Sequence, residues 1–153
     1  MRAVRVTERF EGTVPEAERC WYDTTRWSRW VDGLDLVLAV EDGWPQAGAT
    51  VTWESGPAGR GRVTEQVIAY EPLSGQTLDV RDGSIRGRQS ILFVPVQAGV
   101  EVTLTLEYQL LRRSIVSPLV DALFIRRAMA VSLGITVTHF GVELDAARGE
   151  RGA

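Results

Sequence analysis

Most of the chain alternates apolar with polar residues, a period-two pattern that predicts β-strands. The clearest example is residues 100–110, where valine, leucine and tyrosine side chains alternate with glutamate, threonine and glutamine. Clusters of glycine, proline and aspartate separate this segment from similar ones and mark the turns between strands. Strands are therefore predicted at residues 4–10, 34–40, 51–55, 60–70, 77–81, 86–94 and 100–110.

Helical signals occupy the two remaining parts of the chain. Thr13 is a suitable N-cap for a short helix that ends near residue 23, and a second short helix follows as far as Trp30. After Ser117, a candidate N-cap, residues 118–147 contain two glycines and no proline beyond the first position, which predicts one long helix. The expected fold class is α+β: one strand, two short helices, about six antiparallel strands and a long C-terminal helix.

Length and composition are those of one globular domain. The chain has 153 residues, of which 44% are hydrophobic and 24% charged. These values are ordinary for a single folded domain. We therefore expect one domain over residues 1–148 and a frayed tail over residues 149–153.

Charge and rare residue types exclude several classes of protein. The net charge of −3 offers no basic field to nucleic acid. No apolar run reaches the roughly 18 residues of a membrane span, and the alternating first residues are no signal peptide, so a soluble, cytoplasmic protein is expected. A single cysteine, Cys20, and a single histidine, His139, exclude a disulfide framework and a histidine-rich metal site. Without a phosphate loop, dinucleotide motif or nucleophile elbow, no cofactor or metal is predicted.

Four segments carry a resemblance to a known family. They are residues 61–65 (GRVTE), 70–72 (YEP), 99–108 (GVEVTLTLEY) and 23–30 (DTTRWSRW). Together they resemble the polyketide cyclase/dehydrase and lipid-transport family of the START-like (SRPBCC) superfamily, over about residues 4–144. The resemblance implies a helix-grip fold, in which a curved antiparallel sheet of about seven strands wraps the long helix around a cavity. It also implies that the cavity binds a lipid, a polyketide or a similar metabolite.

One face of the predicted long helix is apolar except for an arginine. At about 100° per residue, the face expected to lie against the sheet and the cavity contains Leu119, Ala122, Arg126, Met129, Leu133, Val137, Phe140 and Leu144. A buried guanidinium needs a partner. Arg126 therefore reaches the cavity rim, pairs with a strand carboxylate such as Glu8 or Glu65, or anchors an anionic or carbonyl-bearing ligand. Each of these two glutamates is, in turn, either a pocket carboxylate or an ion-pair partner.

The opposite face of this helix is also apolar, which is unusual for a helix that rests on a sheet. Its residues are Phe124, Ala128, Val131, Ile135, Thr138 and Val142. Such a stripe predicts a covered surface. We expect a homodimer through Phe124, Val131, Ile135 and Val142, with coverage by strand ends and loops as the alternative. A regulatory partner on this face, or contact of residues 110–129 with a membrane surface, also remains open.

The candidate ligand-binding residues combine aromatic walls with a few polar groups. They are Trp27, Trp30, Trp53, Arg88, Phe93, Tyr108, Arg126, Met129, Leu133 and Phe140. Aromatic walls suit a flat or greasy ligand, but the same side chains also suit a filled core. Arg88 projects into the cavity only if the Ser90 face of its strand points inward, and is otherwise solvated.

Two functions follow, and the sequence favours the first. The first is binding of a hydrophobic small molecule, which needs no catalytic residue. The second is a polyketide aromatase/cyclase or dehydratase that works by orienting its substrate, with Arg88, Arg126 and Tyr108 as polar elements. Its acidic carrier protein would need a basic pocket mouth, for which the candidates are Arg26, Arg29, Arg112 and Arg113.

Overall fold

The computed structural model describes residues 2–57, 59–111 and 118–152, with side chains of the last segment from residue 123 onward. The predicted order of strands and helices is confirmed, and most boundaries lie within two residues of those expected. The elements are β1 (Arg2–Phe10), α1 (Val14–Tyr22), the 3-10 helix η1 (Thr24–Arg26), α2 (Trp27–Trp30), β2 (Leu34–Val40), β3 (Thr50–Ser55), β4 (Arg62–Glu71), β5 (Gly75–Arg81), β6 (Ile85–Val96), β7 (Gly99–Leu110) and α3 (Pro118–Gly152).

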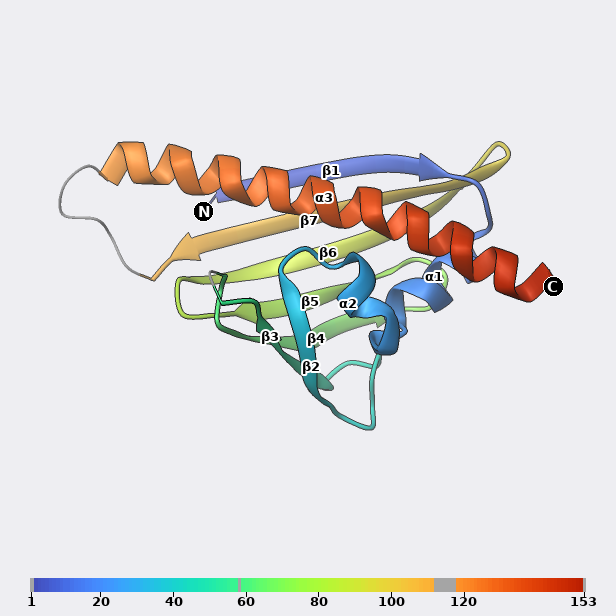
Figure 1. The fold of residues 1–153 in the computed structure, drawn as a ribbon, viewed down its shortest axis with the longest axis horizontal. Helices are drawn as coiled ribbons and strands as arrows, with labels where there is room; N and C mark the ends of the chain where they lie inside the picture. Colours follow the sequence, from blue (N-terminus) through green and yellow to red (C-terminus); the bar gives the residue numbers. More distant parts are fainter. Residues whose placement is uncertain (1, 58, 112–117, 153) are drawn as a thin grey trace.

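The strands of the described chain form one seven-stranded antiparallel sheet in the order β1-β7-β6-β5-β4-β3-β2. Neighbours in sequence are neighbours in the sheet from β2 to β7, and the N-terminal strand β1 adds to the far side of β7. The helices lie on one face, with α3 running along β1 and with α1 and α2 beside it (Figure 1). This is the expected helix-grip arrangement.

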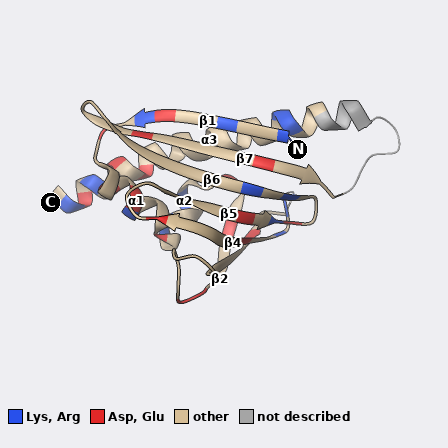
Figure 2. Ribbon diagram, turned by 180° about the vertical axis from the view of Figure 1, so that it is seen from behind, with Lys and Arg blue, Asp and Glu red and all other residues tan. Residues whose placement is uncertain are grey.

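Alternation along the strands decides which side chains form the core. On β7, Val100, Val102, Leu104, Leu106 and Tyr108 are buried while their alternates are at least partly exposed. The outer face carries charged groups of both signs, which are interspersed rather than gathered by sign (Figure 2). Tight contact between strands requires glycine at position 87, because a Cβ there would collide with the backbone at Glu107 and Tyr108.

The first helix begins where its cap was predicted. Thr13 accepts a hydrogen bond from the Glu16 backbone N–H, and the Glu16 carboxylate accepts one from the Thr13 N–H. This reciprocal capping box satisfies two N–H groups at the helix start. The second short helix divides into η1 and α2, and Asp23 caps η1 through the Thr25 N–H.

The long helix packs its predicted inner face on the sheet and extends further than expected. Leu133, Val137, Phe140 and Leu144 are buried against the sheet and the short helices. Residues 149–152, expected as a frayed tail, continue α3 to Gly152. Ion pairs of Glu150 with Arg26 on η1, and of Arg148 with Glu16 on α1, hold these last turns in place. The candidate cap Ser117 lies outside the described residues.

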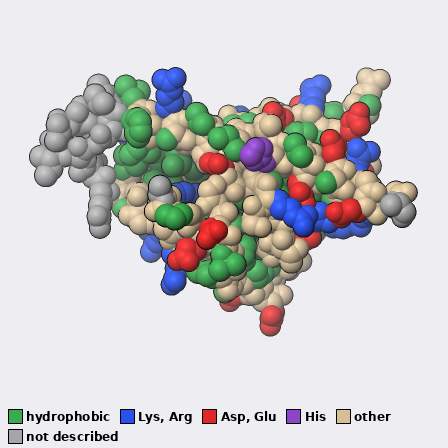
Figure 3. Space-filling view, viewed as in Figure 1, with side chains coloured by type: hydrophobic (Ala, Val, Ile, Leu, Met, Phe, Trp, Pro, Cys, Tyr) green, Lys and Arg blue, Asp and Glu red, His purple; other side chains and the backbone are tan. Residues whose placement is uncertain are grey.

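The opposite face of α3 is exposed along much of its length. Phe124 is 72% exposed, Val131 56% and Val142 67%, whereas Ile135 is half-buried. Apolar side chains appear along the helix in the space-filling view (Figure 3). Strand ends and loops of the described chain therefore leave this stripe uncovered. Among the described helices, none combines the length and the hydropathy needed to cross a membrane.

Candidate functional site

A small, partly open cavity of about 50 Å³ lies between the sheet and the helices α2 and α3. Four tryptophans contribute to its wall, namely Trp21, Trp27, Trp30 and Trp53. The remaining lining residues come from the inner face of the sheet, from the corner between α2 and β2, from the turn before β4 and from one stretch of α3. They are Val31, Asp32, Arg60, Glu65, Gln76, Leu78, Gln89, Leu104, Ser132, Leu133 and Thr136.

Three neighbouring strands turn a polar side chain toward this cavity. Glu65 on β4, Gln76 on β5 and Gln89 on β6 each lie two positions from a buried aliphatic residue of the same strand. Successive side chains of a strand point to opposite faces, so a residue in step with buried neighbours also points inward. The inner surface of an otherwise apolar sheet therefore contains a polar patch.

Glu65 is the buried acidic group of this patch, with 6% of its surface exposed. Burial raises the pKa of its carboxyl group from 4.5 to about 7, because a charged carboxylate is poorly solvated in the interior. Arg60 and the nearby indole N–H of Trp53 partly oppose this increase in pKa, although the indole does not reach hydrogen-bond geometry with the carboxyl group. The carboxyl group therefore changes protonation near neutral pH.

Arg60 reaches the patch from the turn before β4 and is held from two sides. Its Nε pairs with the buried carboxylate of Asp82, which also accepts hydrogen bonds from the backbone N–H groups of Ser84 (2.7 Å) and Ile85 (2.9 Å). The guanidinium carbon lies 5.7 Å from the centre of the Trp53 ring, within cation–π range. These contacts fix the guanidinium group at the cavity wall.

Several buried polar atoms of the cavity wall have no hydrogen-bond partner within the described chain. They are Trp30 Nε1, Trp53 Nε1, Arg60 Nη2 and Gln76 Oε1. The amide of Gln76 is oriented by its own Nε2, which donates to the carbonyl of Pro45 at 3.1 Å. Buried polar groups without a partner are rare in native proteins. Side chains that line the cavity therefore carry three N–H groups and one carbonyl oxygen that have no partner within the described chain.

Other tryptophans of the same cluster are satisfied internally. Trp27 Nε1 donates to the carbonyl of Trp21 at 2.8 Å, and Trp44 Nε1 donates to the carbonyl of Tyr22 at 2.9 Å. The indoles of Trp30 and Trp53 differ from these two in having no partner within the described chain, a state shared by the buried hydroxyl groups of Tyr22 and Tyr108 outside the cavity.

The corner between α2 and β2 closes the cavity against α3 through Asp32. The Asp32 backbone N–H donates to Thr136 Oγ1 at 2.9 Å, and Ser132 Oγ donates to the Asp32 carboxylate at 2.8 Å. Side-chain hydrogen bonds of this kind contribute about 1 kcal/mol each. This contact is therefore weak enough to open.

The structure brings four of the predicted ligand-binding residues to this cavity and places the other apolar ones elsewhere. Trp27, Trp30, Trp53 and Leu133 line the cavity. Phe93 and Phe140 belong to an aromatic cluster around Trp21, whose ring centre lies 6.2 and 5.0 Å from theirs. Met129 is half-buried against the core, and Tyr108 is fully buried on β7.

The two predicted pocket arginines are both exposed to solvent. The inward residues of β6 are Gly87, Gln89, Ile91 and Phe93, so Arg88 lies on the outer face, in register between Asp79 and Glu107. Arg126 is exposed although its position on the helix faces the sheet, because a long side chain can carry its charge out to water. Within the described chain, Glu8 accepts a hydrogen bond from Thr138 rather than pairing with Arg126. Neither arginine can anchor a ligand in this cavity from where it lies.

Sequence reasoning named Glu65 but missed its polar neighbours. Gln89 did carry a signal, because it interrupts a run of apolar residues on one face of β6, and Gln76 shares its strand face with the apolar Leu78 and Val80. Arg60 and Asp82 carried none, since turn residues 22 positions apart are brought together by the pairing of β4 with β5.

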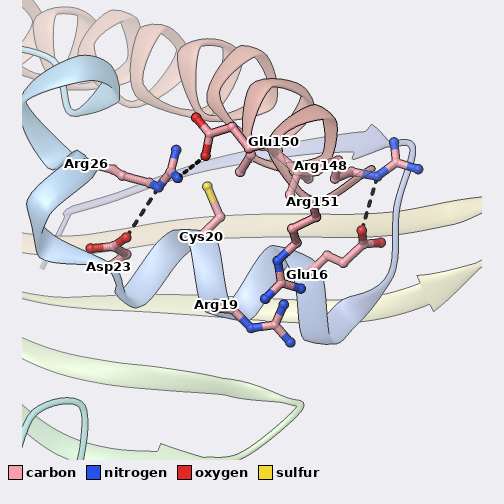
Figure 4. Close-up of a pocket in the computed structure, with 10 residues that line it drawn as sticks. Glu16, Arg19, Cys20, Asp23, Arg26, Arg148, Glu150 and Arg151 are labelled. Carbon is pink, nitrogen blue, oxygen red and sulfur yellow. Dashed lines mark hydrogen bonds and ion pairs between the residues drawn. The ribbon is translucent and has the colours of Figure 1, made fainter. Parts of the chain in front are cut away.

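A second depression, of about 190 Å³, separates α1 from the last turns of α3 and is lined by charged side chains (Figure 4). Arg26 pairs with Asp23 at 3.3 Å and with Glu150 at 2.6 Å, and Arg148 pairs with Glu16 at 3.5 Å (Figure 4). These pairs fasten the end of α3 to α1 and η1. A wider hollow of about 670 Å³ lies on the outer face of the sheet, over β1 and β4–β7.

Two of the four arginines expected at a basic pocket mouth take part in ion pairs. Arg26 and Arg29 both donate to the Glu143 carboxylate, at 2.7 and 3.1 Å, and the Arg29 side chain remains 60% exposed. Arg112 and Arg113 lie outside the described residues.

Cys20 is buried beside this depression, and burial raises the pKa of its thiol to about 12. This burial agrees with the small apolar residue expected at this position.

Among the residues that the structure describes, no cluster of three or more His, Cys, Asp or Glu side chains is placed to hold an ion.

Comparison with known proteins identifies the family. The model of the polyketide cyclase/dehydrase and lipid transport family matches residues 1–140. A solved structure from Thermus thermophilus superposes with a TM-score of 0.75 at 18% identity, covering 95% of this chain and 99% of that one. The di-domain ARO/CYC StfQ from the steffimycin biosynthetic pathway superposes with a TM-score of 0.75 at 11% identity, covering 96% of this chain and 51% of StfQ. No curated protein matches the sequence. The fold and the match over residues 1–140 together place this chain in the polyketide cyclase/dehydrase and lipid-transport family.

Proposed function

We propose that this protein binds a hydrophobic small molecule in the cavity between the sheet and α3. The observation that carries the proposal is the set of unpartnered buried polar atoms on an otherwise aromatic and aliphatic wall. Ligand sites combine mostly apolar walls with a few polar groups that fix orientation. Each buried polar atom left unpaired costs about 1–3 kcal/mol, which a ligand that pairs with these atoms would recover.

Binding requires the cavity to widen. Its volume of about 50 Å³ is smaller than the roughly 150 Å³ that accommodates benzene in a protein interior. The Asp32 contact with Ser132 and Thr136 is the place where widening costs least, because it consists of side-chain hydrogen bonds at the cavity edge. The ligand therefore enters between the α2–β2 corner and α3.

Native mass spectrometry followed by denaturing extraction tests this proposal. We expect the purified protein to carry a small molecule that extraction releases. The variant Gln89→Phe places a bulky ring on the cavity wall and should lose the molecule, whereas Gln109→Phe, on the exposed face of β7, should keep it. Equal occupancy of the two variants would show that the molecule binds elsewhere.

A second candidate is the cyclisation or dehydration of a polyketide in the same cavity. Glu65 favours it, because a carboxyl group that titrates near neutral pH can act as a general acid or base. The similarity to StfQ, described as an ARO/CYC, supports it as well. Glu65→Gln should then abolish turnover of a polyketide mimic while leaving its binding within about threefold, and unchanged turnover would remove this candidate.

A further inference from the structure

We propose that the exposed apolar face of α3 is the contact surface of a homodimer in which the α3 helices of two copies pack antiparallel. This inference concerns a partner of the protein, so it does not depend on what the cavity binds. The face, which we call the α3 stripe, consists of Phe124, Ala128, Val131, Ile135, Thr138 and Val142. It points away from the sheet, because the buried residues of α3 lie on the opposite side of the helix.

The α3 stripe is apolar and continuous. Phe124 is 72% exposed, Val131 56% and Val142 67%. None of its six residues is charged, and together they extend for about 27 Å along the helix. Apolar side chains are visible along α3 on the face of the molecule that Figure 3 shows. An exposed apolar surface of this extent marks an interaction site on a folded protein.

The spacing of the α3 stripe suits contact with its own copy. Successive residues are separated by 4, 3, 4, 3 and 4 positions, a series that reads the same in both directions around Leu133. A two-fold interface uses one patch twice, so that the patch must be complementary to itself. An axis perpendicular to α3 at the level of Leu133 pairs every residue of the stripe with another one in the second copy: Phe124 with Val142, Ala128 with Thr138 and Val131 with Ile135.

Charged residues beside the α3 stripe favour the antiparallel arrangement. Thr138 donates a hydrogen bond to Glu8 on β1, and Arg127 lies about 20° from Thr138 around the helix, on the same side of the stripe. The two-fold axis brings Arg127 of one copy level with Thr138 of the other, and therefore beside Glu8 of that copy. Within the described chain, neither Arg127 nor Glu8 takes part in an ion pair. A parallel dimer would instead place the two Arg127 side chains together, where like charges repel.

A membrane surface fits the same face less well. Helices that lie on anionic membranes carry mostly basic residues beside their apolar face. The last turns of α3 carry Glu143, Asp145 and Glu150 as well as arginines, and anionic lipids repel such carboxylates. A second copy of the chain, with Arg127 and Glu8 in reach of each other, meets no such repulsion.

The length of the contact sets the expected strength of the dimer. Stable interfaces bury at least about 1,200 Å² in total, and one helix face of this length from each copy supplies an area near that lower limit. We therefore expect a reversible dimer with a dissociation constant in the roughly micromolar range.

Sedimentation over a series of protein concentrations measures this constant and tests the charged contacts. Arg127→Glu should weaken the dimer at least about fivefold, because it makes two attractive contacts repulsive. Adding Glu8→Arg to this variant restores opposite charges and should return the constant to within about twofold of the wild-type value. The control Arg126→Glu makes the same change about 160° from the centre of the stripe and should leave the constant unaltered.

Distances between nitroxide labels test the antiparallel register. Labels are attached to His139→Cys and, in a separate variant, to Ala146→Cys, both at exposed positions, while Cys20 stays buried. Equivalent labels in the two copies should lie about 18 Å apart along the helix axis at position 139 and about 39 Å apart at position 146, because each separation is twice the distance from the level of Leu133. A parallel dimer would give two similar, short separations.

Each result decides the proposal. A monomer at every concentration that stays in solution would overturn it. So would a dimer that Arg127→Glu does not weaken, or one whose two label separations are equal. A monomer that binds vesicles of phosphatidylcholine and phosphatidylserine, and loses this binding in Val131→Asp, would assign the α3 stripe to a membrane surface instead.

Discussion

The carboxyl group of Glu65 makes a quantitative prediction about folding stability. Its pKa is about 7 in the folded protein and 4.5 in water, so the folded state binds more protons than the unfolded state between these values. Stability must then fall as the pH rises through this window. The difference in pKa corresponds to about 3 kcal/mol once the pH exceeds 7.

Glu65→Gln isolates this contribution, because glutamine keeps the size of the side chain and cannot ionise. The stability gained by the variant over the wild type should be below about 1 kcal/mol at pH 5 and should grow by about 2–3 kcal/mol by pH 8. For a domain of this size, that growth corresponds to roughly 5–10 °C in melting temperature.

Urea unfolding at a series of pH values between 5 and 8 measures this difference, with Glu54→Gln as the exposed control. A stability difference that does not change with pH would refute the reasoning. A variant less stable than the wild type at pH 8 would do the same, because it would mean that Arg60 and Trp53 hold the group as a stabilised carboxylate.

Three further predictions concern the rest of the molecule. Val131→Asp, on the exposed stripe of α3, should convert a dimer into a monomer of lower sedimentation coefficient, and an unchanged coefficient would count against the predicted homodimer. Asp82→Ala should destabilise the fold by about 2–4 kcal/mol in urea unfolding, because it removes the partner of Arg60 and the acceptor of two backbone N–H groups. A loss below about 0.5 kcal/mol would show that this ion pair contributes little. Cys20 should resist thiol reagents at pH 8 until the protein unfolds, and rapid modification of the folded protein would contradict its raised pKa.

Local patterns were sufficient to predict the elements. Period-two alternation located every strand of the described sheet, and the Thr13 signal located the start of α1. The main departure lay at the C-terminus, where a frayed tail was expected over residues 149–153 and residues 149–152 instead continue α3. There the helix persists because Arg26 and Arg148 connect its last turns to the short helices, a contact across more than 100 residues.

The sequence by itself determined the order of the elements, the family resemblance and the candidacy of Glu65 as a pocket carboxylate. Only the tertiary structure decided which face of each strand points inward. A period of two shows which residues share a face of a strand, but not which face points toward the core. Arg88 was therefore a cavity candidate, whereas in the structure Gln89 points inward and Arg88 outward. The tertiary structure also decided that Arg60 pairs with Asp82, and which tryptophan indole N–H groups find a hydrogen-bond partner. These depend on distances between segments far apart in the chain, which no local pattern records.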